Sequence, residues 1–419
     1  MGRERGMGKG VSRRALAALA LAAVALPLVL YLVAARDLRP ESASASPVLS
    51  IAVRPRLAGF AKLTALAERL RHDQVMTSHR LPASYDEDPR AVYGLLDAEL
   101  VRDLPRAVEE VLAPAPVGAV EALMSPPSVE ATWPPALTIA RLLSLQMQRQ
   151  LARQDDGAWQ TARLQLRFVR FLVGQARSFH ELTTAETSCA VVLRALSSGI
   201  AAGRLSAPQI EELQDLPEPA DLVATVLDAA RSEYATFEAQ LDRIRRQEGG
   251  LLGRLYFQPN RTRHAWLAAM SGPVRSLQLG DLPAAHDALA RMVTAGAGRQ
   301  PRIRNSLGAR LTTVSIQGNL EALAQAVDLL ADFRLSRVHA RVAVSRAHSA
   351  QPLDLVGLLG GPQPRFPTDP WAGGQPFHVA KEGRIYSVGR DGRDDHGLFS
   401  RDFSYGGGAL DLGVHLSKE

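Results

Sequence analysis

The chain has 419 residues, of which 46% are hydrophobic, 22% are charged and only 5% are aromatic. This balance is sufficient to bury a core and favours packed helices over a large β-sandwich. The single cysteine, Cys189, excludes intramolecular disulfides and cysteine-based zinc or iron–sulfur sites. It lies on a predicted helix, where we expect it to be a small, buried apolar side chain.

The first 14 residues form a basic tail. They contain five of the chain's basic residues and one acidic residue, which accounts for +4 of the net charge of +6. Nucleic-acid-binding proteins instead gather their basic residues on the folded domain. No groove-reading motif is present, so we expect no nucleic-acid partner. The basic residues of the tail are Arg3, Arg5, Lys9, Arg13 and Arg14.

Residues 15–35 are uncharged and almost entirely apolar. A helix of this length spans about 30 Å, the thickness of a bilayer core. The sequence therefore predicts a transmembrane signal-anchor. The basic tail is expected to stay in the cytoplasm, which places the rest of the chain outside the bacterial inner membrane as a single-pass protein. Two alternatives stay open: a signal peptide cleaved after Val33-Ala34-Ala35, or a buried helix of a soluble protein.

Residues 36–50 are small, polar and contain proline, which predicts a flexible tether. Residues 51–350 read as one helical domain. Its clearest pattern is an apolar stripe over 221–244, typical of the seam of a helical bundle. Apolar spacing predicts the other helices over 57–71, 89–112 with a break at Pro105, 136–153, 158–179, 181–202, 281–294 and 305–347.

Several turns in this domain carry local signals. Gly157 suits a left-handed position between two helices. Ser206 followed by Pro208 and Gln209 is a typical helix start. The run from Tyr256 to Thr262 predicts a buried loop that reorients the chain, in which Asn260 and Thr262 cap the next helix.

The last segment, 364–419, has a different character. Glycine, proline, aspartate and aromatic residues become frequent, and the helical period disappears. Short β-prone runs over 376–380 and 384–388 alternate with glycine turns, which predicts a small antiparallel meander. The predicted fold class is therefore mainly α, with an N-terminal transmembrane helix, a multi-helix extracytoplasmic body and a C-terminal β meander.

Two motifs in this segment resemble a known family. Asp369-Pro370-Trp371 precedes a glycine turn and a strand, and Ser387-Val388-Gly389-Arg390-Asp391-Gly392 follows it. This ending resembles the C-terminal part of type II secretion major pseudopilins, in which it follows a long helix. The chain lacks a prepilin cleavage site, and residues 348–352 replace the usual G-x-Y-P. The resemblance implies a pilin-type terminal module placed on a helical body.

The resemblance also implies calcium. Asp391 matches the loop aspartate of the pseudopilins and Asp411 a later one; Asp394, Asp395 and Asp402 add hard oxygen ligands of the kind that calcium prefers. Two alternatives stay open. One is a solvated turn in which arginines neutralise these carboxylates, and the other is a mixed metal site. The arginines are Arg390, Arg393 and Arg401, and the histidines of a mixed site are His378, His396 and His415.

No catalytic signature is present: the chain contains no G-x-S-x-G, H-E-x-x-H, P-loop or dinucleotide-binding motif. The sequence favours a non-enzymatic scaffold or partner-binding protein, anchored in the membrane and associated with a secretion or envelope assembly. The alternatives are an envelope hydrolase with a dispersed site and a protein that binds a small ligand between its helices.

Overall fold

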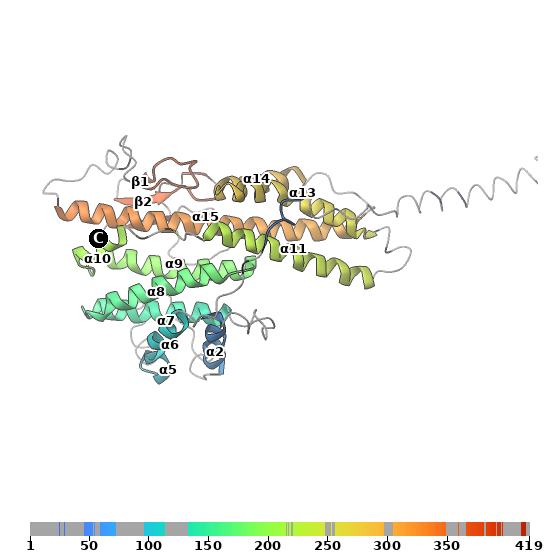
Figure 1. Ribbon diagram of the computed structural model, residues 1–419. Helices are drawn as coiled ribbons and strands as arrows, with labels where there is room; N and C mark the ends of the chain where they lie inside the picture. Colours follow the sequence, from blue (N-terminus) through green and yellow to red (C-terminus); the bar gives the residue numbers. More distant parts are fainter. Residues whose placement is uncertain are drawn as a thin grey trace, which may run out of the picture.

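The structure is a computed structural model, shown in Figure 1. Among the residues that it describes, no helix is long and apolar enough to cross a bilayer. Apart from Ala25 and Val29, the predicted anchor 15–35 lies outside these residues. The described residues are Ala25, Val29, 46–52, 54, 59–72, 96–113, 133–214, 216, 218, 221–247, 253, 256–296, 305–348, 359, 366–380, 383–390, 392–394, 396 and 412–415.

The described chain is mainly helical and ends in a small antiparallel sheet, which confirms the coarse fold class. The helices are α2 (Gly59–His72), α5 (Glu99–Arg102), α6 (Leu104–Leu112), α7 (Trp133–Ala152), α8 (Gly157–Gln175), α9 (Phe179–Ala201), α10 (Ala207–Gln214), α11 (Leu222–Gln247), α13 (Pro259–Gln278), α14 (Leu282–Gly296) and α15 (Ser306–His348). The strands are β1 (His378–Val379), β2 (Arg384–Ser387) and β3 (Leu412–His415).

The long helix α15 runs through the length of the body (Figure 1). One side of it contacts α13 and α14, and another contacts α9 and α10. α9 in turn packs on α7 and α8, and α2 and α6 cover α7 and α8 from the far side. One continuous core joins these layers, and its largest fully buried side chains include Trp133, Trp266, Phe60, Phe168 and Phe333.

The apolar stripe predicted over 221–244 is the buried face of α11. Its members at steps of three and four are 4% exposed or less, because this face packs against α9, α13 and α15. The buried members are Leu222, Val226, Ala230, Tyr234, Phe237 and Leu241.

Local signals were right for some turns and wrong for others. The Ser206 amide donates to the Gln209 side chain at 2.9 Å, as a helix start requires. Gly157 is not left-handed; Gln154 takes that conformation, with φ of 56°. Asn260 and Thr262 do not cap α13, because the helix already begins at Pro259.

Asn305, at the start of α15, occupies the capping position instead. Its Oδ1 accepts from the Gln258 amide at 2.8 Å and from the Thr262 hydroxyl at 3.1 Å. A side chain on Gly308 would collide with Thr262 and Asn305, so this crossing of α13 and α15 requires glycine.

The C-terminal sheet has the strand order β1-β2-β3, with both pairs antiparallel. The predicted meander is confirmed, although β3 was not expected. Ile385 and Phe377 pack with Leu335, Val338 and Val342 of α15 in a second, smaller core. The sheet is therefore attached to the long helix along an apolar face.

The body begins earlier in the chain than residue 51. Residues 46–51 form turns, and Val48 is fully buried in the main core. The last residues of the predicted tether 36–50 therefore belong to the body. The apolar side chain of Val48 explains the difference, because burying it stabilises the turn.

Candidate functional site

The predicted calcium ligands fall mostly outside the described part of the chain. Asp394 is the one that the structure describes, and Asp391, Asp395, Asp402 and Asp411 lie outside it. Within the described residues, no group of three or more histidine, cysteine, aspartate or glutamate side chains is arranged to hold a metal ion.

The described neighbours of Asp394 are hydrogen-bond donors. Its Oδ1 accepts hydrogen bonds from the Tyr386 hydroxyl and the His396 amide, both at 2.8 Å. The Nδ1 atom of His378 lies 3.6 Å from Oδ2. The described partners of this carboxylate are therefore two hydrogen-bond donors and a ring nitrogen. Calcium binding depends on the four carboxylates that lie outside the described residues, and it stays a prediction. The backbone hydrogen bond of His396 and the Tyr386 hydroxyl help to hold the pKa of Asp394 below its usual range, despite its partial desolvation.

The two motifs of the pseudopilin resemblance contact each other. Asp369 is fully buried, and its Oδ1 accepts from the Ser387 hydroxyl at 2.7 Å and from the Trp371 amide at 2.9 Å. Its Oδ2 accepts from the Val388 amide at 3.2 Å. One carboxylate therefore joins the turn at 369–371 to the end of β2, and fixes where Trp371 and Arg390 point.

Both of these side chains contact the long helix. The Trp371 indole donates to Oδ1 of Asp328 at 2.9 Å, and Arg390 Nε donates to Oδ2 of the same residue at 2.6 Å. Arg390 also donates to Glu321 at 2.5 Å, and Glu321 lies about two turns before Asp328 on the same face of α15. The ring of Trp371 meets His286 of α14 edge-on at 4.9 Å. The C-terminal segment is therefore docked on α15 by polar contacts as well as by its apolar core.

Asp328 belongs to a group of carboxylates between α9 and α15, which we call the acidic seam: Glu186, Glu321, Asp328 and Asp332. Glu186 is 3% exposed, and neither of its carboxylate oxygens has a hydrogen-bond partner in the described part of the chain. Burial raises the pKa of Glu186 well above its usual range, and Asp328 adds to the shift while Arg390 opposes it. Burial likewise raises the pKa of Asp332 to about 6, against the opposing charge of Arg194.

Cys189 lies one turn after Glu186 on α9 and is fully buried. Burial raises the pKa of its thiol well above the usual range, and Glu186 adds to the shift. A thiol in this state is not a nucleophile, which agrees with its interpretation as a small apolar side chain.

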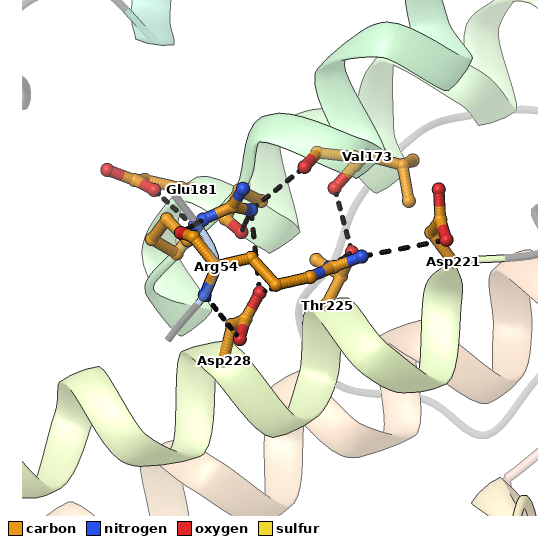
Figure 2. Close-up of polar contacts among 9 residues, drawn as sticks. Arg54, Val173, Glu181, Asp221, Thr225 and Asp228 are labelled. Carbon is orange, nitrogen blue, oxygen red and sulfur yellow. Dashed lines mark hydrogen bonds and ion pairs between the residues drawn. The ribbon is translucent and has the colours of Figure 1, made fainter. Parts of the chain in front are cut away.

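A second buried charged group lies where the N-terminal segment enters the body (Figure 2). We call Arg54, Arg177, Thr225 and Asp228 the arginine clamp. Arg54 donates to both oxygens of Asp228, from Nε at 2.7 Å and from its amide at 3.2 Å. Its Nη2 donates to the Thr225 hydroxyl at 2.9 Å.

Arg177 completes this clamp. Its Nε donates to the Arg54 carbonyl at 2.8 Å, and its Nη1 lies 3.7 Å from the Asp228 carboxylate. The Arg177 amide donates to Glu181 at 2.6 Å. The side chains of Asp228 and Arg177 are only 3% and 8% exposed. The clamp thus joins the entering chain to α11 and to the connection between α8 and α9.

Sequence reasoning missed the acidic seam and the arginine clamp. Arg54 and Asp228 are 174 residues apart, and Glu186 is far in sequence from Asp328. The available signal was weak: Asp228 and Glu186 stand among small and apolar residues on predicted helices, where an unpaired carboxylate is unexpected.

No protein-family model matches the chain, and neither a curated protein nor a solved structure is significantly similar to it.

Proposed function

We propose that this protein is a membrane-anchored, non-enzymatic scaffold on the outer side of the bacterial inner membrane, where its helical body binds protein partners of a secretion or envelope assembly. The arginine clamp is the observation that carries this proposal. A chain that leaves an anchor at residue 35 is fixed to the body by residue 54, where the partly exposed Arg54 meets the buried side chains of Asp228 and Arg177. Such a joint limits how far the helical body can lie from the anchor in the membrane.

The docked C-terminal segment supports the same function. Its turn at 369–371 and its strands are fixed by Asp369 and by the contacts of Trp371 and Arg390 with α15. The pseudopilin resemblance of this segment suggests a partner in a secretion assembly, by analogy only.

The hydrolase alternative would place its acid and base in the acidic seam, where carboxylates with raised pKa values are close together. Glu186 is buried between helices, and Asp328 already bonds to Trp371 and Arg390. A substrate would have to displace these contacts, so the scaffold is the better supported function.

The single buried cysteine makes a topology experiment direct. In a Cys189→Ala background we would place one cysteine in the basic tail (Ser12→Cys) or on the exposed face of α8 (Gln160→Cys). We expect a membrane-impermeant maleimide to label position 160 in spheroplasts, and position 12 only after lysis.

Resistance to carbonate extraction tests the anchor itself. Wild-type chain is expected to stay in the membrane pellet, whereas a Leu21→Arg/Val24→Arg variant, which interrupts the apolar run, is expected to be released. Labelling of both positions only after lysis, or release of the wild-type chain, would contradict the proposed function.

A further inference from the structure

Among the described residues of the body, three of the four exposed large apolar side chains lie at one end. The four are Tyr256, Leu279, Met292 and Val314, which are 45%, 86%, 45% and 70% exposed. Leu279 lies just after α13, at the far end of that helix. The other three lie near the start of α13, the last turns of α14 and the first turns of α15.

Contacts between the helices bring these segments together. Arg263 of α13 pairs with Glu238 of α11, so the end of α11 lies beside the start of α13. The Trp266 indole of α13 donates to Ser315 of α15 at 2.9 Å, so α15 starts at this end too. A methyl group at Gly272 would touch Ala288, which sets α14 antiparallel to α13. Figure 1 shows α11, α13 and α15 converging here.

This end is also basic. The arginines are all exposed, and none forms a hydrogen bond or ion pair with another residue in the described part of the chain. Among the described carboxylates near these arginines, Asp242 is exposed and Glu238 is paired with Arg263. Asp287, one turn before Arg291, lies 3.2 Å from the ring nitrogen Nδ1 of His286. We call this surface the basic end, made of Arg243, Arg245, Arg246, Arg291 and Arg310 together with Tyr256, Met292 and Val314.

We infer that the basic end docks on the anionic phospholipid headgroups of the membrane that holds the anchor. Arginines that lack a protein partner complement headgroup phosphates, and isolated apolar side chains among them enter the boundary between headgroups and acyl chains. An anionic protein surface would account for the arginines. It would not account for exposed apolar side chains that lie singly between them.

The spacing along the chain permits this contact. From the arginine clamp at Asp228 to Arg243 is 15 residues of α11, or roughly 22 Å at 1.5 Å per residue. The ten residues 36–45 between the predicted anchor and the body reach at most about 33–36 Å. The body can therefore lie with its basic end on the bilayer while the clamp holds the entering chain.

This inference deepens the proposed function and rests on it. The test uses full-length chain in a Cys189→Ala background, reconstituted in vesicles of phosphatidylcholine with or without phosphatidylglycerol. An environment-sensitive fluorophore is attached at Val314→Cys or, as the matched exposed control, at Leu279→Cys. Lipids with a nitroxide on the acyl chain serve as quenchers.

We expect quenching and a blue shift at position 314 in the vesicles that contain phosphatidylglycerol, and neither at position 279. Raising the salt from about 0.1 M to about 1 M shortens the screening length from about 10 Å to about 3 Å and should reverse the effect. Replacing all five arginines by glutamine should abolish the effect while the chain stays resistant to carbonate.

Equal quenching at the two positions, or no dependence on phosphatidylglycerol, would overturn the docking while leaving the anchor in place. Release of the chain by carbonate would instead overturn the anchor. In that case the comparison of positions 314 and 279, with vesicles added to the released chain, still tests the basic end by itself.

Discussion

The arginine clamp and the acidic seam both bury charge, and they do so in opposite ways. In the clamp, the Asp228 carboxylate receives two hydrogen bonds from Arg54 and lies near Arg177. In the seam, Asp328 is paired with Arg390, but the nearby Glu186 carboxyl has no hydrogen-bond partner among the described residues. The clamp therefore pairs its buried carboxylate, whereas the seam carries a carboxyl group, Glu186, whose pKa burial raises well above its usual range.

The paired Asp228 contributes to folding, whereas folding alone does not explain the unpaired Glu186. Removing one partner of a buried ion pair destabilises a fold, whereas an unpaired buried polar group destabilises the fold while it is present. The four predictions below test the comparison, from the largest expected effect to the smallest.

Asp228→Ala should have the largest effect. It leaves the buried Arg177 and the partly exposed Arg54 without their carboxylate. Removing one partner of a buried ion pair destabilises a fold by about 3–5 kcal/mol. Chemical denaturation measures the loss, and limited proteolysis should show earlier cleavage near residue 54. Asp221→Ala is the matched control, because Asp221 pairs with the same Arg54 at 3.6 Å but is 68% exposed; its removal should cost less than about 1 kcal/mol. Equal losses in the two variants would show that the clamp is not a buried joint.

Trp371→Phe should come next. It removes the indole hydrogen bond to the Asp328 carboxylate while keeping a ring beside His286. A hydrogen bond to a charged group contributes about 1.5–3 kcal/mol. Hydrogen exchange should show faster exchange in residues 369–389 than in wild type, with α7 and α8 unchanged as an internal reference. Unchanged exchange in 369–389 would mean that the apolar core alone holds this segment.

Glu186→Met should stabilise the fold, by about 1–3 kcal/mol, because it replaces an unsatisfied buried carboxyl with an apolar side chain of similar size. Thermal unfolding measures the change. Glu211→Met, at an exposed position of α10, is the control and should be near neutral. A destabilised Glu186→Met variant would show that the seam is compensated after all, and the contrast with the clamp would fail.

The smallest effect concerns pH. The folded pKa of Asp332, about 6, is above its ordinary value of 3.8. The folded chain therefore binds more protons between these values, and this group's contribution to stability falls as the pH rises from about 4 to about 6. Asp332→Asn removes that loss. The free energy of unfolding of the variant, relative to wild type, should therefore rise by about 1 kcal/mol between about pH 4 and about pH 6 and stay constant above this window. Denaturation at several pH values measures the difference; a flat difference would refute the raised pKa.

Several parts of the fold could be predicted because their signals are local. The stripe of α11 repeats every three or four residues, and Asp281 caps α14 by accepting from the Ala284 amide at 2.9 Å. The meander was signalled by glycine turns between β-prone runs. Strand β3 was missed because residues 412–415 form a short run that is interrupted by Gly413. Their pairing with β2, which the sequence does not show, makes them a strand.

Capping around α13 shows why other features could not be predicted. Local preference favoured Asn260 and Thr262, but the acceptor is Asn305, 47 residues from the amide that it caps. The candidate site has the same limit. Asp394 was selected as a calcium ligand, which the described residues do not test. Its described partners include Tyr386 and His378, which pair across β1 and β2.

By itself, the sequence determined the helical character of the body, the positions of most helices, the C-terminal meander and the buried, inert state of the one cysteine. These follow from periodicity, turn chemistry and composition, which act over a few residues. Only the tertiary structure decided which charges meet. Arg54 and Asp228, or Glu186 and Asp328, are neighbours because helices distant in sequence pack together, and the cost or gain of a buried charge depends on that packing rather than on the residue itself.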